Sequence, residues 1–137
     1  PQAVVFDKAL NQLDNISIPS IEYRLTDATS ISEEGFFWAI NYFYPEEETL
    51  KPDIDPIAES FGRGKTHAKE NTVERLLQFS LQNGSVILGP KAPVQLTLET
   101  GISRNWEGVV VLEDRGFLII TDTYPRSLFA FVPFRHN

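Results

Sequence analysis

Residues 107–122, which read EGVVVLEDRGFLIITD, decide the fold. Two apolar runs, 109–112 and 117–120, flank the polar sequence Asp114-Arg115-Gly116. Short runs of Val, Ile and Phe bounded by Asp and Gly are typical of strands joined by a turn. We therefore predict two antiparallel strands here.

Both runs are apolar on both faces of the predicted strands, unlike residues 94–98 (VQLTL), which alternate apolar and polar side chains. A strand that is apolar on both faces requires cover on both faces. Helices can cover one of them. Sheet curvature, the acidic loop at 45–55 or a second subunit is then expected to cover the other, so a homodimer is one prediction.

The chain from Ser85 onward carries further strand signals of the same kind. Strands are predicted at 85–88, 94–99, 107–113, 117–122 and 127–134, separated by Gly and Pro turn sequences. The pattern indicates an antiparallel meander.

The first 83 residues carry helix signals instead. Apolar spacing and capping residues predict helices at 3–13, from Ser32 to Tyr44, from Asp55 to Gly62, and from Asn71 to Asn83. A short strand is expected at 20–26, where apolar and polar residues alternate. The predicted fold class is a single α+β domain over residues 1–137, in which N-terminal helices pack on a C-terminal antiparallel sheet of four to five strands.

Composition narrows the classes of function. The chain has 137 residues, no Cys and a net charge of −7. These values exclude a disulfide scaffold, a Cys-based zinc site and a basic nucleic-acid-binding module. No apolar run is long enough for a membrane-spanning helix. The absence of Cys and of a signal-peptide pattern at residues 1–7 favours a cytoplasmic location.

The net negative charge of the chain comes entirely from its first half. Residues 1–62 hold 12 acidic and 3 basic side chains, a net charge of −9, whereas residues 63–137 hold 7 acidic and 9 basic, a net +2. An acidic surface attracts a basic partner and repels nucleic acid and anionic lipid.

Aromatic residues are densest in the same acidic half. Trp38 and Tyr42 lie off the main apolar stripe of the predicted helix, Tyr44 ends that stripe, and three carboxylates follow closely. Aromatic anchors beside charged residues are typical of protein-binding surfaces. We therefore predict a non-catalytic protein-binding or regulatory protein of the inhibitor, neutraliser or assembly-factor type, without a cofactor. The predicted binding residues are Trp38, Tyr42, Tyr44, Glu46, Glu47 and Glu48.

Two alternatives remain open. A small hydrolase or nuclease would use His67 and His136 as an acid–base pair, with Lys65 stabilising the developing negative charge. The carboxylates at 46–55 would hold Ca²⁺ or Mg²⁺ in a metal-dependent version, although they lack the order of an EF-hand. Gly64-Lys65-Thr66 lacks the earlier Gly of a phosphate-binding loop, because position 59 is Glu. The second alternative is a small-molecule binder with an aromatic-lined pocket between helices and sheet.

Overall fold

The computed structural model describes residues 1–70, 72–97, 104–122 and 126–134, except for the side chains of residues 47, 48 and 50. Strands dominate the described chain. Its elements are β1 (Gln2–Ala3), β2 (Ile16–Ser17), β3 (Arg24–Ala28), β4 (Phe36–Phe43), the 3₁₀-helix η1 (Pro45–Leu50), α1 (Pro56–Phe61), β5 (Val73–Gln82), β6 (Ser85–Leu88), β7 (Val94–Gln95), β8 (Trp106–Leu112), β9 (Gly116–Thr121) and β10 (Phe129–Pro133).

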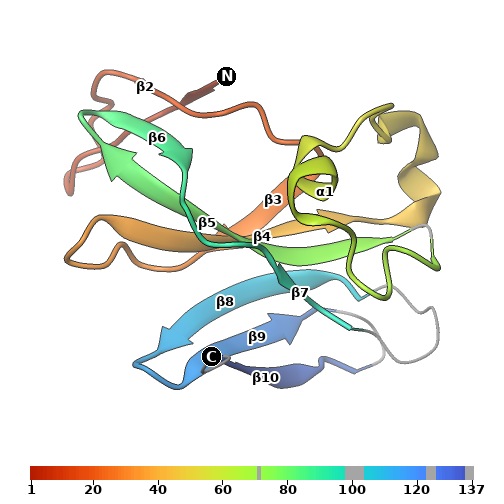
Figure 1. Ribbon diagram of the computed structural model, residues 1–137. Helices are drawn as coiled ribbons and strands as arrows, with labels where there is room; N and C mark the ends of the chain where they lie inside the picture. Colours follow the sequence, from red (N-terminus) through yellow and green to blue (C-terminus); the bar gives the residue numbers. More distant parts are fainter. Residues whose placement is uncertain (71, 98–103, 123–125, 135–137) are drawn as a thin grey trace.

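The strands form two sheets stacked on each other (Figure 1). The large sheet has the order β1-β2-β6-β5-β4-β3, with β7 pairing β5 beyond the end of β6, and the small sheet has the order β10-β9-β8. In Figure 1 the small sheet lies below the large sheet, whereas α1 and residues 45–55 lie above it. The predicted α+β class, with N-terminal helices packed on one C-terminal sheet, is therefore wrong.

The segment predicted as a helix from Ser32 to Tyr44 contains strand β4. This strand pairs with β5 without a break, from Phe36 opposite Ser80 to Phe43 opposite Val73. The aromatic run has strand propensity, and its pairing with a neighbour outweighs the capping signal. Ser32 closes the turn before the strand instead, because its hydroxyl oxygen accepts the Phe36 N–H at 3.2 Å.

The segment predicted as a helix from Asn71 to Asn83 contains β5, the central strand of the large sheet. Its apolar residues fit a helical period and a strand period equally, and a central strand buries both of its faces. The expected helix end at Asn83-Gly84 is the hairpin turn between β5 and β6. Both turn residues have positive φ, 50° at Asn83 and 73° at Gly84, as a tight hairpin turn requires.

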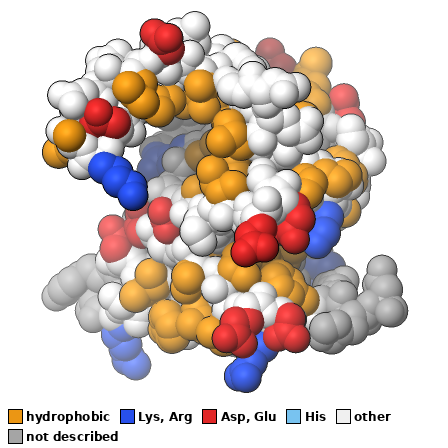
Figure 2. Space-filling view, turned by 90° about the vertical axis from the view of Figure 1, so that its left-hand side faces the viewer, with side chains coloured by type: hydrophobic (Ala, Val, Ile, Leu, Met, Phe, Trp, Pro, Cys, Tyr) orange, Lys and Arg blue, Asp and Glu red, His pale blue; other side chains and the backbone are white. Residues whose placement is uncertain are grey.

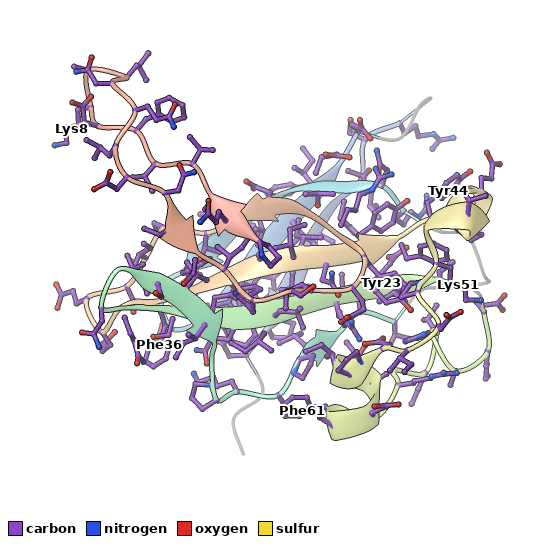
Figure 3. All side chains as sticks on the ribbon, turned by 90° about the horizontal axis from the view of Figure 1, so that it is seen from above. Lys8, Tyr23, Phe36, Tyr44, Lys51 and Phe61 are labelled. Atoms are coloured by element: carbon purple, nitrogen blue, oxygen red, sulfur yellow. The ribbon has the colours of Figure 1, made fainter. Side chains whose placement is uncertain are left out.

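Residues 1–18 form an extended arm, so the helix predicted at 3–13 is also wrong. Strand β1 pairs with β2, and a turn at Asp7 reverses the chain between them. The Asp7 carboxylate accepts the N–H groups of Ala9 at 2.8 Å and Asn11 at 2.9 Å. Side-chain bonds of this kind compete with the backbone bonds of a helix. Figure 3 shows the arm, which carries Lys8, projecting beyond the sheets.

Other predictions are confirmed. Helix α1 begins after Asp55, whose carboxylate accepts the Ala58 N–H at 3.1 Å, and has Pro56 in its first turn. Strands β8, β9 and β10 occupy the segments predicted at 107–113, 117–122 and 127–134. The predicted strand at 85–88 is β6, but it joins the large sheet rather than the C-terminal meander.

The two faces of the large sheet bury two separate apolar clusters. Trp38, Ile40 and Leu76 pack downward against Phe117 and Ile119 of the small sheet. Ala39, Leu77 and Phe79 pack upward, where Ile57 of α1 covers them. The central strands β4 and β5 are thus covered on both sides, as burial of adjacent residues along them requires.

Candidate functional site

The structure buries two of the aromatic residues of the predicted patch. Trp38 and Tyr42 belong to the core cluster between the sheets, with 8% and 2% of their surface exposed. The helical interpretation had assigned them to outer faces, but in β4 both point toward the small sheet with Ile40.

Tyr44 and Glu46 lie together at the end of β4. Tyr44 is half-buried against the core cluster, and Glu46 is exposed in η1. A hydrogen bond to the Glu46 carboxylate raises the pKa of the Tyr44 hydroxyl. The side chains of Glu47 and Glu48 lie outside the described part of the structure.

Only one member of the predicted acid–base pair lies within the described residues. His67 is half-buried and Lys65 is exposed, both in the loop after α1, while His136 lies outside the described residues. Burial is the main cause that lowers the pKa of His67, and the charges of Arg63, Arg75 and Lys51 lower it further, against the opposing effect of Asp55. The His67 Nδ1 atom is buried and has no hydrogen-bond partner within the described part of the chain.

Asp55, which was grouped with the candidate metal ligands, is bound to an arginine. Its carboxylate accepts two hydrogen bonds from Arg75, at 2.9 and 3.0 Å. Burial raises the pKa of Asp55, but the bonds from Arg75 and from the Ala58 N–H outweigh it and hold the pKa below its usual value. Among the residues described, no group of three or more His, Asp or Glu side chains is placed to hold a metal ion.

Arg75 is the centre of a buried polar network that the sequence did not indicate. It is 0% exposed, and its Nε donates to Asn41 Oδ1 at 2.7 Å. The Asn41 amide in turn donates to the Glu22 carbonyl at 2.8 Å, and the Tyr23 ring lies 5.6 Å from the guanidinium. The network ties β4, β5 and the start of α1 together. Since Arg75 is enclosed, its role in this structure is to hold these elements and not to meet a ligand.

A second buried polar contact joins the two sheets. Glu74 on β5 is 3% exposed and accepts the Trp106 Nε1–H at 2.6 Å and the Arg104 N–H at 2.7 Å. Trp106 begins β8, so this carboxylate fixes the small sheet beneath the large one. Hydrogen bonds to a charged group are stronger than those between neutral groups.

The outer face of the small sheet, by contrast, leaves large apolar side chains in solvent. Phe129 lies opposite Ile120, which lies opposite Gly108, and Phe131 lies opposite Leu118, which lies opposite Val110. The exposed fractions are 64% for Phe129, 49% for Phe131, 42% for Ile120 and 52% for Val110. We call these four residues and Leu118 the outer apolar face. Figure 2 views the small sheet from one end, in the lower half of the molecule, where hydrophobic side chains lie among charged ones.

The two edges of the small sheet differ. At the β8 edge the Asp27 carboxylate of β3 accepts the Val109 N–H at 2.8 Å, and the Thr26 hydroxyl donates to the Trp106 carbonyl at 2.7 Å. At the opposite edge, no strand of the described chain pairs with the free side of β10. One edge is closed by side chains, and the other presents backbone groups.

An open hollow of about 670 Å³ lies at the N-terminal arm, lined by Val5, Gln12, Leu13 and Asp14. None of these residues is aromatic, and the hollow does not lie between helices and a sheet. It is therefore not the aromatic-lined pocket predicted for a small-molecule binder.

Comparison of the chain with protein-family models, with curated protein sequences and with solved structures finds no match. In the described part of the chain, no helix is long and apolar enough to cross a membrane.

The sequence pattern indicated only part of the outer apolar face. The runs at 109–112 and 117–120 are apolar on both sides, which indicated that a second cover was needed. Residues 129–132 (FAFV) show the same pattern within the strand predicted at 127–134. The acidic loop does not supply the cover, because residues 45–55 lie on the other side of the large sheet (Figure 1).

Proposed function

We propose that this domain is a non-catalytic protein-association module that binds another polypeptide through the outer apolar face and the free edge of β10. The observation that carries the proposal is the continuity of the exposed apolar side chains across all three strands of the small sheet. This keeps the class of function that the composition favours and moves the binding surface from residues 38–48 to β8–β10.

The outer apolar face supports the proposal by its chemistry. Contiguous exposed apolar surface is rare on monomeric proteins and is typical of interaction sites. Two of its residues, Phe129 and Phe131, are aromatic, and aromatic side chains are enriched in the centres of interfaces. A partner that buried them would gain about 25 cal/mol for each Å² of apolar surface removed from water.

The free edge of β10 supports the proposal by its geometry. An extended peptide that adds a strand to a sheet edge obtains affinity from backbone hydrogen bonds and specificity from alternate side chains. The edge strand β10 offers both, because its exposed Phe side chains lie beside backbone groups that face solvent. The kind of partner that fits is an extended segment with apolar residues at alternate positions.

The test uses a fluorescently labelled peptide of alternating Thr and Val, with fluorescence anisotropy at protein concentrations low enough to keep the chain monomeric. Specific binding is expected, and the double variant Phe129→Thr, Phe131→Thr should weaken it at least about tenfold, since two anchoring contacts are lost. Ile54→Thr is the matched control, because Ile54 is 59% exposed but lies in the loop before α1. Equal binding of the peptide to the double variant and to Ile54→Thr would contradict the proposal. The absence of binding to the original chain and to both variants would contradict it as well.

A further inference from the structure

The hydrogen-bond pattern of β10 shows which backbone groups reach its free edge. The Thr121 N–H donates to the Leu128 carbonyl at 3.0 Å, and the Phe134 N–H donates to the Arg115 carbonyl at 2.9 Å. In an antiparallel pair, alternate residues direct both backbone groups toward the same neighbour. Residues 128, 130, 132 and 134 therefore face β9, and the N–H and C=O groups of Phe129 and Phe131 face away from it.

Only the last residue of β10, Pro133, is of a kind that protects a sheet edge. Natural edge strands are commonly guarded by Lys, by Pro or by a bulge. Residues 129–132 (FAFV) carry no charge, and the register between β9 and β10 runs without a shift from Phe129 to Pro133. Pro133, which has no N–H, stands only at the end of the strand. The open stretch is thus two edge-facing residues long and ends at Pro133.

We propose that the occupant of this edge is a second copy of the chain, whose β10 pairs antiparallel with the first about a two-fold axis at Ala130. This inference rests on the proposed function and names the partner of the β10 edge, which is one of the two parts of the proposed binding surface. The pairing places Phe129 of each copy opposite Phe131 of the other. It joins the two small sheets into one continuous sheet of six strands.

This register gives both open residues backbone partners. With Phe129 opposite Phe131, the four free N–H groups of the two strands meet the four free C=O groups, which makes four hydrogen bonds. A shift by two residues that places Phe131 opposite itself would set Phe129 opposite Pro133, and the Phe129 carbonyl would lose its donor. A two-fold axis at Ala130 leaves Pro133 outside the paired stretch.

The side chains also suit a two-fold pairing. Each Phe129–Phe131 pair lies on the outer face of the joined sheet, and cross-strand aromatic pairs stabilise antiparallel strands. The paired stretch contains no charged residue, so the two identical strands meet without repulsion between like charges. The outer apolar faces of the two copies then form one surface twice as wide.

Cross-linking tests the register directly, because the chain has no Cys. Ala130 would lie opposite itself in a non-hydrogen-bonded pair, where the Cα atoms are about 4.5 Å apart, within the range for a disulfide. The variant A130C, oxidised with diamide, should form a disulfide-linked dimer several-fold faster than V132C. Val132 lies on the same face as Ala130 but would be offset from its counterpart by four residues, or about 13 Å.

Light scattering on the unmodified chain provides the second measurement. A mass twice the 15.5 kDa of one chain is expected at high micromolar concentration, and the Phe129→Thr, Phe131→Thr variant should return to the mass of one chain. Circular dichroism and a cooperative urea transition confirm that each variant folds.

The outcomes separate this inference from the proposed function. A mass of one chain at every concentration overturns the second copy as occupant, while binding of the alternating peptide would leave the function intact. A doubled mass with equal disulfide rates for A130C and V132C overturns the β10 pairing and assigns the dimer to another surface. If the unmodified chain shows neither peptide binding nor self-association, the proposed function itself is overturned.

Discussion

Two strands depart from the usual pattern of burial, and they do so in opposite ways. One is the central strand of the large sheet, and the other is the edge strand of the small sheet. Strand β5 buries Glu74, Arg75 and Gln78, whereas β10 exposes Phe129 and Phe131. The polar residues of β5 have internal partners for their buried atoms, while the apolar residues of β10 have no cover in the described structure. Burial here follows the position of the strand in its sheet and not its hydropathy. The difference marks the large sheet as the stabilising part and the small sheet as the part that carries the proposed binding surface.

The substitution Arg75→Met is expected to have the largest effect, because it disrupts the buried polar network of the large sheet. It would leave Asp55 as a buried carboxylate without its bidentate partner and would remove a donor from Asn41. Breaking one side of a buried ion pair costs about 3–5 kcal/mol of unfolding free energy. Urea unfolding measures the loss.

The matched control is Arg115→Met, because Arg115 is an exposed residue of the turn between β8 and β9. A change within about 0.5 kcal/mol is expected there, as for most surface substitutions. Equal losses for the two arginines would show that the buried network does not stabilise the large sheet.

Trp106→Phe tests the polar contact that joins the two sheets. The variant keeps an aromatic ring in the core but removes the Nε1–H that donates to Glu74. Loss of one donor to a buried acceptor costs about 1–3 kcal/mol. In the Glu74→Gln background the same substitution should cost less, because the acceptor is then uncharged. Additive effects of the two changes in a double-mutant cycle would argue against direct coupling.

The lowered pKa of His67 predicts that the unfolding free energy depends on pH. Burial and the cations Arg63, Arg75 and Lys51 hold its pKa below the ordinary 6.5, despite the attraction of Asp55. The folded state therefore binds fewer protons than the unfolded state in this range, and the stability contribution present above pH 6.5 is lost as the pH falls through the folded pKa. His67→Asn should flatten the fall in unfolding free energy just below pH 6.5. An unchanged slope would contradict this assignment.

A second loss of stability is expected at lower pH. Burial raises the pKa of Asp55, but Arg75, the Ala58 N–H and the charge of His67 together lower it by more, so the folded pKa lies below 3.8. The contribution of Asp55 is present above that value and disappears as the pH falls through the folded pKa. The fall should persist in the His67→Asn variant, which separates the two groups.

The sequence predicted the C-terminal strands because short apolar runs there are bounded by Asp, Gly and Pro. It failed for β4 and β5, since both strands are buried on both faces and their apolar residues also fit a helical period. Burial on both faces depends on α1 above and the small sheet below, which no local pattern contains. Arg75 could not be recognised as a core residue, because Asp55 and Asn41 are distant in sequence and only the folded chain brings them together.

The candidate site was predictable only in part. The apolar runs of β8 and β9 predicted cover on both faces, but Val110 and Ile120 are exposed on the outer face of the described structure. Phe129 and Phe131 gave no such signal on their own, because an aromatic residue in a strand is more often part of the core. The predicted patch at 38–48 depended on a helix, and its aromatic residues turned inward when that segment became β4.

Two neighbouring isoleucines give the finest test of the comparison, because they differ only in the face of β9 that they occupy. Ile120 is 42% exposed on the outer apolar face, whereas Ile119 is 2% exposed in the core. Thr at position 120 keeps the Cγ2 methyl group, which lies over Gly108, and keeps the β-branch that strands favour. The unfolding free energy of the monomer should therefore change by less than about 0.5 kcal/mol.

The same change at Ile119 would bury a hydroxyl group without a partner and cost about 1–3 kcal/mol. Peptide binding should show the reverse order. Ile120→Thr removes apolar surface from the binding face and should weaken the labelled peptide, while folded Ile119→Thr should bind it unchanged. Equal stability losses at both positions would mean that the outer face is already covered within the chain, and the distinction between a stabilising sheet and a binding sheet would fail.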